Sequence, residues 1–303
     1  MSAARDIVVF DLRNADGEDL DPFEPGAHVT LVTPSGARRN YSIANDSAER
    51  HRYVLAVKLE RGGRGGSSGL INGVGEGDLI EISQPQNSFA LVEAAEYLLI
   101  AGGIGITPIM SMLHHLSRSH ANYRLIYCTR DAEVTAFREV LAEAPFSSQV
   151  EIHHDAGDAD RIFDFWPVLE TPSRAHVYCC GPRPMMDDVR DMTGHWPHGS
   201  IHFEDFASDV QPIRPDDTAF KVRHADTGQV FEIAADATIL DTLRGCGEDL
   251  ASSCESGTCG TCKTELLGGE PDHRDRVLED TQRDGYIMVC VSRARSDELV
   301  LRW

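Results

Sequence analysis

The chain has 303 residues, enough for two or three domains with separate cores. Apolar residues make up 41% of the sequence and charged residues 25%, as in an ordinary globular protein, and the formal net charge is -21. This acidity argues against nucleic acid or an anionic membrane surface as a partner; it favours a basic partner or simply a well-solvated surface. Neither a long apolar run nor an N-terminal signal pattern is present, so a cytoplasmic protein is expected.

The first 95 residues have the pattern of short strands separated by turns. Runs rich in β-formers occur at 7–10, 28–32 and 53–57, with glycine- and proline-containing turns between them. Helical periodicity is confined to a short piece near 69–72. This pattern predicts a small antiparallel β-barrel.

Two polar stretches in this region carry possible chemistry. The segment 39–42 combines a cation, an aromatic ring and a hydroxyl, and Lys58 precedes a loop at 61–68 that is rich in glycine, arginine and serine. Backbone N–H groups of such a loop can bind a phosphate, with charge supplied by Arg39, Lys58 or Arg64. Each stretch alone is also typical of an ordinary strand or a flexible loop, but together they predict a site for a phosphate and a ring.

From residue 96 the pattern changes to alternating strands and helices, which predicts a parallel sheet covered by helices on both faces. A buried strand at 97–101 leads into a glycine turn at 102–106. Thr107 is expected as the helix N-cap and Pro108 as the first helical residue. Such a turn can bind a dinucleotide pyrophosphate on its N–H groups. Because Pro108 stands where the dinucleotide motif has its third glycine, this string alone leaves nucleotide binding and a structural turn open.

A second loop is expected at the same edge of this sheet. The remaining elements of the region are strands at 123–128, 150–154 and 175–179 and helices at 135–143 and from 185 onward. Cys180, Gly181 and Pro182 follow the last of these strands, so their backbone lies at the carboxyl edge, where parallel sheets bind ligands. The apolar surroundings of Cys180 favour a packed thiol over a redox thiol.

The C-terminal region follows a polar segment at 209–217 that contains two prolines and is typical of a linker. Strands are expected at 220–222 and 230–233, a helix at 239–244, and a buried strand at 286–291. The last of these elements contains a cysteine far from the others.

Four cysteines have the spacing C-x4-C-x2-C with a distant fourth, and three of them lie in one loop of small residues. Four thiolates in this arrangement are the plant-type ligand set of a [2Fe–2S] cluster, whereas zinc sites favour two short cysteine pairs. The predicted ligands are Cys254, Cys259, Cys262 and Cys290. The other four cysteines lie mainly in apolar runs, which indicates buried free thiols in a reducing compartment.

These motifs follow one another in an order that resembles the phthalate dioxygenase reductase family, including reductases of the vanillate demethylase type. The resemblance covers nearly the whole chain, and the stretch at 272–275, Asp-His-Arg-Asp, looks like that subgroup. The motifs that carry it are R-x-Y-S at 39–42, R-G-G-S at 64–67, G-G-I-G-I-T-P at 102–108, Y-C-C-G-P at 178–182 and the cysteine set.

The resemblance implies a multidomain fold. Its parts are an FMN-binding antiparallel β-barrel (1–95), an NAD-binding α/β domain with a parallel sheet (96–208), a linker (209–217) and a plant-type ferredoxin domain of the α+β β-grasp class (218–303). Tyr41 is expected to stack on the isoalloxazine ring and Ser42 to bond near its N5 edge.

By match to the family's motifs, the resemblance also implies which residues contact each cofactor. The flavin is assigned to Arg39, Tyr41, Ser42, Val57, Lys58, Gly65, Gly66, Ser67 and, at the domain junction, Phe206. The nicotinamide dinucleotide is assigned to Gly103, Gly105, Thr107, Pro108, Thr129, Arg130, Asp131, Cys180, Gly181 and Pro182.

The implied function is the reductase of a two-component Rieske-type oxygenase, acting as a monomer that passes electrons from NADH through FMN to the [2Fe–2S] cluster. No cysteine is followed two places on by histidine, so the Rieske centre is expected on a separate oxygenase. A stand-alone NADH diaphorase or ferric reductase, and a non-enzymatic electron carrier, remain alternatives. Arg130 leaves NADPH open, because it could pair with a 2′-phosphate, and FAD in place of FMN also stays open.

Overall fold

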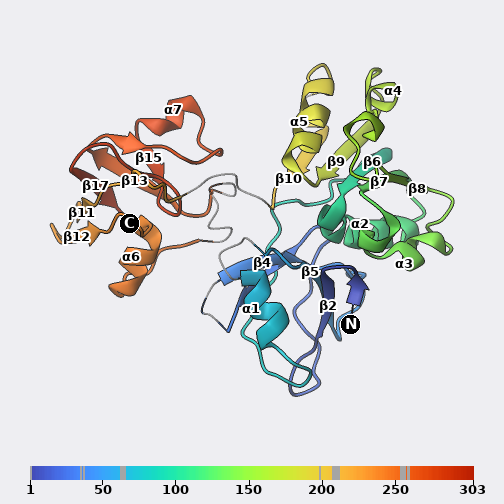
Figure 1. Ribbon diagram of the computed structural model, residues 1–303, viewed down its shortest axis with the longest axis horizontal. Helices are drawn as coiled ribbons and strands as arrows, with labels where there is room; N and C mark the ends of the chain where they lie inside the picture. Colours follow the sequence, from blue (N-terminus) through green and yellow to red (C-terminus); the bar gives the residue numbers. More distant parts are fainter. Residues whose placement is uncertain are drawn as a thin grey trace. The chain divides into compact units, whose positions relative to one another are not determined.

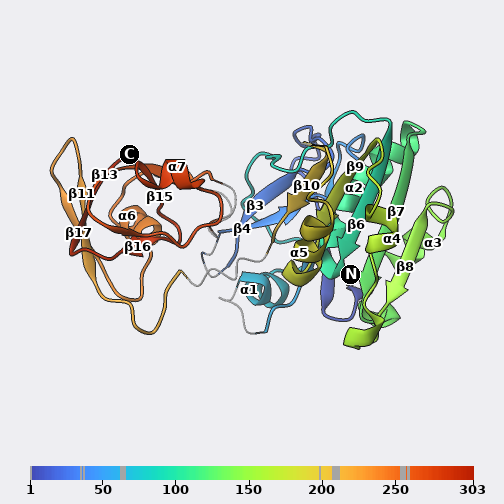
Figure 2. The same cartoon turned by 90° about the horizontal axis from the view of Figure 1, so that it is seen from above.

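The computed structural model describes residues 2–34, 36, 38–61, 66–197, 199–206, 212–252, 257 and 260–303. The chain divides into two compact units, Met1–Phe206 and Ala207–Trp303 (Figures 1 and 2). The finer domain boundaries expected from the sequence stay predictions. Among the described residues, every helix is too short or too polar to cross a lipid bilayer.

The N-terminal part of the first unit is antiparallel β structure. Its strands are β1 (Ser2–Ala4), β2 (Ile7–Leu12), β3 (His28–Val32), β4 (Arg38–Ser42) and β5 (Tyr53–Lys58). The three-stranded sheet has the order β1-β2-β5, and β3 pairs with β4. Alternate side chains of these strands, such as Val29, Leu31 and Leu55, are fully buried in one core. Helix α1 (Gly66–Gly73) adds Leu70 to that core, at the place where a short helical piece was expected.

The rest of the first unit is an α/β layer structure. Its parallel sheet has the order β10-β9-β6-β7-β8. The strands are β6 (Glu96–Gly102), β7 (Asn122–Thr129), β8 (Val150–His154), β9 (Ala175–Cys180) and β10 (Ile201–Glu204). The helical segments are η1 (Gly103–Gly105), α2 (Ile106–Arg118), η2 (Ala132–Val134), α3 (Arg138–Ala142), η3 (Ala159–Arg161), α4 (Trp166–Leu169) and α5 (Arg183–Met192).

This sheet is buried on both faces, as its continuous apolar strands predict. Along β6, Leu99 and Ala101 enter the core that α2 and α3 cover, whereas Leu98 and Ile100 enter the core that α4 and α5 cover. Successive side chains of a strand point to opposite faces, so one strand supplies both layers. The predicted parallel sheet with helices on both faces is confirmed.

Two predictions about helix starts in this layer were wrong. Thr107 is not an N-cap: helix α2 begins at Ile106 with Gly105 in the cap position, because the glycine turn winds into the 3-10 segment η1 that runs directly into α2. The helix expected at 135–143 begins only at Arg138 and ends at Ala142. The hydroxyl of Thr135 donates to the carbonyl of Asp131 at 2.7 Å, and this local bond competes with the helical ladder.

The second unit is a mixed five-stranded sheet with the order β12-β11-β17-β13-β15 and a helix packed on it. Its elements are β11 (Phe220–His224), β12 (Val230–Ile233), α6 (Ile239–Gly245), β13 (Lys263–Gly268), β14 (Pro271–Asp272), α7 (Asp280–Arg283), β15 (Tyr286–Met288), β16 (Arg293–Ala294) and β17 (Glu298–Arg302). The central strands β11 and β17 are parallel, and their other neighbours are antiparallel. The predicted ferredoxin-like fold is confirmed, although the strand expected at 286–291 ends at Met288 and leaves Cys290 in the following turn.

Candidate functional site

A cavity of about 520 Å³ opens at the carboxyl edge of the parallel sheet in the first unit. It brings together residues that lie far apart in the sequence and were predicted separately, namely Lys58, Gly103, Thr129, Arg130 and Pro182. Its floor includes apolar rings from the segment that precedes α4. The structure therefore places the glycine turn, the end of β7 and the loop after β9 around one volume of nucleotide size.

The glycines at this edge have two different roles. A Cβ atom on Gly105 would lie 2.2 Å from the carbonyl oxygen of Cys180, and one on Gly102 would lie 2.5 Å from Cδ of Pro182. These two glycines let the loop after β6 and the loop after β9 pack backbone to backbone. Gly103 differs, because its φ of 53° is left-handed and nothing lies within 4 Å of its Cβ position. Gly103 is thus the open position, where a pyrophosphate can approach the backbone.

Gly181 continues this close packing, since its Cβ would lie 2.5 Å from Cε of Met185. Thr107 and Pro108 are buried in the first turn of α2, and the hydroxyl of Thr107 donates to the carbonyl of Ile104 at 3.1 Å. These three predicted residues shape the turn around Gly103. Their direct contact with a nucleotide stays a prediction.

The segment after β7 offers a cation at the cavity. Arg130 is exposed and lines it. The carboxylate of Asp131 is already engaged: it accepts from the N–H groups of Glu133 and Val134, and it pairs with Arg5 at 3.2 Å. Asp131 therefore caps η2, whereas Arg130 lines the cavity; the contact of either residue with a dinucleotide ribose stays a prediction.

The predicted flavin residues of β4 carry a buried hydroxyl that fits a flavin ring. Ser42 is 4% exposed, and its Oγ atom has no hydrogen-bond partner among the described residues. A buried polar atom in this state is costly unless a ligand satisfies it. The neighbouring Tyr41 is half-buried, and burial raises the pKa of its hydroxyl against the opposing effect of the Arg39 charge. A ring with hydrogen-bonding edges would pair with Ser42 and lie on Tyr41.

Several of the residues predicted to bind the flavin phosphate lie at or near the start of α1. A Cβ on Gly66 would lie 2.8 Å from Nε of Arg39, so the guanidinium lies against this helix terminus. Ser67 accepts from the N–H of Glu60 at 3.0 Å, and Lys58 pairs with the carboxylate of Glu60 at 3.2 Å. The predicted contacts at Arg64 and Gly65 fall outside the described residues. Those described gather positive charge and small residues at one helix end, which fits a phosphate.

Two other predicted flavin contacts differ in exposure. Val57 is 1% exposed and packs in the β core, so only its backbone is available to a cofactor. Phe206 ends the first unit with 44% of its surface exposed, just after the ion pair between Arg183 and Asp205. Its ring is accessible, and its place beside the flavin stays a prediction.

Glu204 is a residue that the sequence reasoning missed. It lies on edge strand β10, directly opposite Cys180 in the parallel register. Burial raises the pKa of its carboxyl to about 8, and its Oε2 atom has no hydrogen-bond partner among the described residues. Burial also raises the pKa of the Cys180 thiol well above its ordinary value. Both groups are therefore neutral at pH 7, which supports a packed rather than a redox role for Cys180.

A signal for Glu204 was present in the sequence. It follows Ile-His-Phe at 201–203, and a carboxylate at the end of a strand is a candidate for a perturbed pKa, although the burial that raises this pKa comes from tertiary packing.

In the second unit, two of the four predicted cluster ligands converge. The Sγ atoms of Cys262 and Cys290 are 3.0 Å apart, and both residues are buried. They do not form a disulfide bond with each other, because their separation exceeds the roughly 2.05 Å of an S–S bond. Cys254 and Cys259 lie outside the described residues. Two buried thiols that meet without bonding fit ligands of one metal centre, since the remaining predicted ligands are nearby in sequence.

The backbone beside these thiols is shaped for a tight loop. Gly257 and Gly260 have φ values of 75° and 82°, which favour glycine. A Cβ on Gly257 would lie 2.7 Å from Cγ2 of Val291, so the loop packs closely on the turn that carries Cys290. The described parts of the ligand loop therefore fit the predicted [2Fe–2S] cluster.

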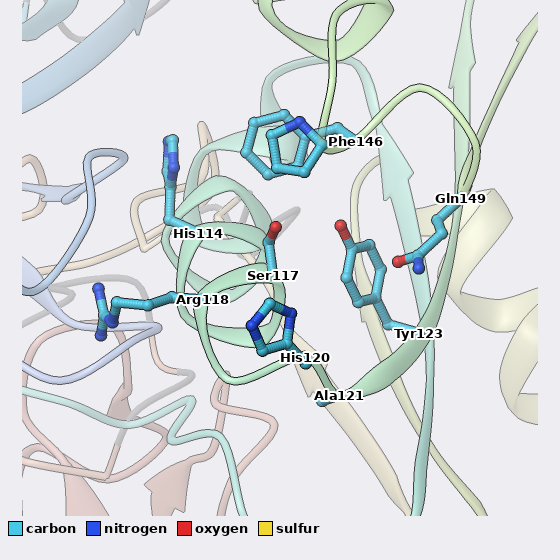
Figure 3. A pocket seen from close by; sticks show the side chains of 9 residues that line it. His114, Ser117, Arg118, His120, Ala121, Tyr123, Phe146 and Gln149 are labelled. Carbon is cyan, nitrogen blue, oxygen red and sulfur yellow. The ribbon is translucent and has the colours of Figure 1, made fainter.

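A second cavity, of about 640 Å³, lies at the opposite edge of the parallel sheet (Figure 3). It contains none of the predicted residues. Its walls come from the end of α2 and the start of β7, and the amide of Gln149 is turned toward Tyr123. Arg118 at its rim is already ion-paired with Asp46. Its position, away from the carboxyl edge, separates it from the nucleotide site.

Fold and site together define an NAD-dependent oxidoreductase with an iron–sulfur centre. The family described as oxidoreductase NAD-binding domain matches residues 99–191, and the family described as 2Fe-2S iron-sulfur cluster binding domain matches residues 222–295. These matches fall on the parallel sheet and on the second unit.

Full-length relatives narrow this class. The chain is 52% identical to the phthalate dioxygenase reductase of Burkholderia cepacia, over 98% of this chain and 93% of that one. It is 38% identical to a vanillate O-demethylase oxidoreductase of Pseudomonas putida, over 98% and 96%. A solved structure of phthalate dioxygenase reductase, described as modular for electron transfer from pyridine nucleotides to [2Fe-2S], superposes with a TM-score of 0.88 at 51% identity, covering 100% and 95%.

The chain belongs to the phthalate dioxygenase reductase family. The prediction of an NADH-dependent oxygenase reductase with FMN and a [2Fe–2S] cluster as cofactors is confirmed at the level of the family. The individual cofactor-contacting residues stay predictions.

Proposed function

We propose that this protein delivers electrons from NADH to a separate Rieske-type oxygenase, with the first unit binding nucleotide and flavin and the second carrying the exit centre. One observation carries the proposal. The same chain has a sheet edge whose glycines leave room for a nucleotide and, in its second unit, two buried thiols that lie 3.0 Å apart. Relatives named as reductase subunits of phthalate 4,5-dioxygenase and of carnitine monooxygenase support a separate oxygenase partner.

At the nucleotide end, the backbone of this chain does most of the binding. The backbone at Gly103 is open, so its N–H group and those at the start of α2 bind the pyrophosphate. Gly105 holds the loop after β9 against that turn, and so places Cys180 and Gly181 where a nicotinamide ring would lie. Arg130 faces the ribose end and sets the preference between NADH and NADPH.

At the flavin end, side chains orient the ring. The hydroxyl of Ser42 donates to the ring edge, Tyr41 covers one face, and Arg39, with the terminus of α1, binds the phosphate. Bound FMN would supply the chemistry that links a two-electron hydride donor to single-electron transfer. Cys180 and Glu204 are both neutral at pH 7, so these two residues add no charge to the carboxyl edge of the parallel sheet.

At the exit end, Cys262 and Cys290 hold the cluster from two different segments, and Cys254 and Cys259 complete the set by match to the family's spacing. We also propose that the protein acts as a monomer in the cytoplasm. The free thiols among its described residues support a reducing compartment, and sedimentation of the purified protein measures its mass.

An anaerobic NADH titration of the purified protein tests the proposal. We expect bound flavin and two irons per chain, loss of the flavin absorbance on NADH addition, and subsequent reduction of a purified Rieske oxygenase. Absence of bound flavin would contradict the proposal. Fast reduction of ferricyanide with no reduction of any Rieske protein would favour the stand-alone diaphorase instead.

A further inference from the structure

The four-residue stretch at 272–275 lies in the second unit, and its arginine is almost completely buried. The side chain of Arg274 is 4% exposed. It donates to the carbonyl oxygen of Pro212 at 2.9 Å, to the carboxylate of Asp217 at 2.8 Å and to that of Asp272 at 2.7 Å. Pro212 and Asp217 belong to the predicted linker, so a buried side chain of the second unit binds the linker's end.

A second buried arginine completes this network. The side chain of Arg293 is 2% exposed, donates to the carbonyls of Thr218 and Ala234 at 3.0 Å each, and lies 3.4 Å from the Asp217 carboxylate. Asp217 also accepts from the N–H of Arg214 at 2.7 Å, which closes a turn. The hydrogen bond from Arg274 lowers the pKa of Asp217 to about 2, so this carboxylate stays charged under all ordinary conditions.

Backbone groups of this stretch and of the next residue, Arg276, also contact the segments that carry the predicted cluster ligands. The N–H of Arg276 donates to the carbonyl of Gly257 at 3.0 Å. The N–H of Arg274 donates to Ser292 at 3.2 Å, and that hydroxyl lies 3.5 Å from the carboxylate of Asp275. Gly257 belongs to the cysteine loop, and Ser292 follows Cys290 by two residues. Residues 272–276 therefore connect the end of the linker to the loop and the turn that carry the predicted cluster ligands.

We propose that Arg274 is a positioning residue that fastens the linker to the cluster-carrying unit and thereby limits the length of the tether between the flavin and the cluster. This inference rests on the proposed electron path from the first unit to the second. Among the described residues, Arg274 binds Pro212, Asp217, Asp272 and Ser292, so it acts through the chain that connects the two units.

The expected size of this effect follows from chain length. Six residue steps lead from Phe206 to Pro212, a contour of at most about 21 Å at roughly 3.5 Å per residue. Without the anchor, twelve steps lead from Phe206 to Thr218, whose carbonyl Arg293 still holds. Effective concentration falls as about the −3/2 power of tether length, so release of the anchor lowers it about threefold.

The double variant Arg274→Gln/Asp217→Asn tests the anchor by removing the charges of both partners of this ion pair, while Arg293 keeps its hydrogen bonds to the carbonyls of Thr218 and Ala234. We expect the non-proline amide protons of residues 212–218 to lose protection in hydrogen exchange of the oxidised holoprotein, and flavin-to-cluster electron transfer in stopped flow to slow about threefold. The rate of flavin reduction by NADH and the EPR spectrum of the reduced cluster should not change. Arg302→Ala is the matched control, because it removes an exposed ion pair of the same unit with Asp226 and Glu265.

Unchanged protection of residues 212–218 in the double variant would overturn the inference. So would lost protection with an unchanged electron-transfer rate. If NADH fails to reduce the flavin in the unmodified protein, the proposed function itself is wrong, whereas the exchange experiment still reports on the anchor.

A linker insertion separates a tether effect from general loosening of the second unit. Eight glycine and serine residues inserted between residues 211 and 212 should slow flavin-to-cluster transfer about fourfold in the unmodified protein but only about twofold in the double variant, whose tether is already long. Equal factors in the two backgrounds would show that Arg274 acts only on local stability, and would reject the tether.

Discussion

At the nucleotide edge of the first unit, glycines let two backbone segments meet, so that the site is shaped by the absence of side chains. Beside the cluster thiols of the second unit, by contrast, buried arginines bind carboxylates and carbonyls from distant segments. A backbone-shaped site is sensitive to added volume, and a site held by charged side chains is sensitive to lost partners. The two regions should therefore fail under different substitutions.

Loss of a cluster ligand should have the largest effect. Cys290→Ser removes one of the two converged thiols, so we expect cytochrome c reduction by NADH to fall at least about 100-fold while NADH still reduces the flavin. Iron analysis and the visible spectrum measure the cluster directly. Cys246→Ser is the control, because Cys246 is an exposed free cysteine outside the predicted ligand set, and it should leave all activities unchanged.

Removal of a buried arginine should rank second. Arg293→Ala takes a donor from the carbonyls of Thr218, Ala234 and Ala237 and leaves Asp217 with fewer partners. Breaking a buried pair from one side costs about 3–5 kcal/mol, so urea unfolding of the second unit should shift to much lower denaturant. The exposed Arg223, paired with Glu298, should cost no more than about 1 kcal/mol when changed to alanine. Similar costs for the two variants would contradict the contrast between buried and exposed pairs.

Much of the first region could be predicted from sequence, because its information is local. The glycine turn, the strand before it and the helix after it are adjacent, and period and turn chemistry identify them. The prediction of Thr107 as the N-cap was wrong, because the sequence does not show that the glycine turn forms a 3-10 segment that runs directly into α2.

The network of the second region could not be predicted, because its partners are distant in sequence. Arg274 and Asp217 are 57 residues apart, and nothing in either local string indicates their pairing. Glu204 was missed for the same reason: its raised pKa comes from burial against a neighbouring strand, a tertiary effect that composition does not reveal.

Added volume at the glycine edge should have a smaller effect on stability than the loss of Arg293. Gly105→Ala places a methyl group 2.2 Å from the carbonyl of Cys180, so the two loops must separate, at about 1–3 kcal/mol. Gly103→Ala meets open space and pays only for its left-handed φ, about 1 kcal/mol. Thermal unfolding compares the two, and a larger cost at Gly103 would contradict the assignment of packing to Gly105 and openness to Gly103.

Glu204 links the two kinds of sensitivity, since it is a titratable side chain placed in the region that is shaped by the backbone. Its folded pKa of about 8 lies above the ordinary value of 4.5, so its protonated form favours folding and the associated stability is complete below pH 4.5. As the pH rises from 4.5 through 8, the unfolded chain ionises first and the folded state loses that stability. Because one pKa unit corresponds to about 1.4 kcal/mol, we expect a loss of at least about 2 kcal/mol by pH 9.

Glu204→Gln should abolish this loss, because the amide resembles the protonated carboxyl and does not titrate. Urea unfolding at pH 5, 7 and 9 measures it: the variant should match the unmodified protein at pH 5 and exceed it at pH 9. Glu139→Gln, at an exposed position of α3, should leave the pH profile unchanged. A Glu204→Gln profile parallel to that of the unmodified protein would show that the carboxyl is ionised in the folded state, and the edge beside Cys180 would then carry a negative charge that a nicotinamide cation can pair with.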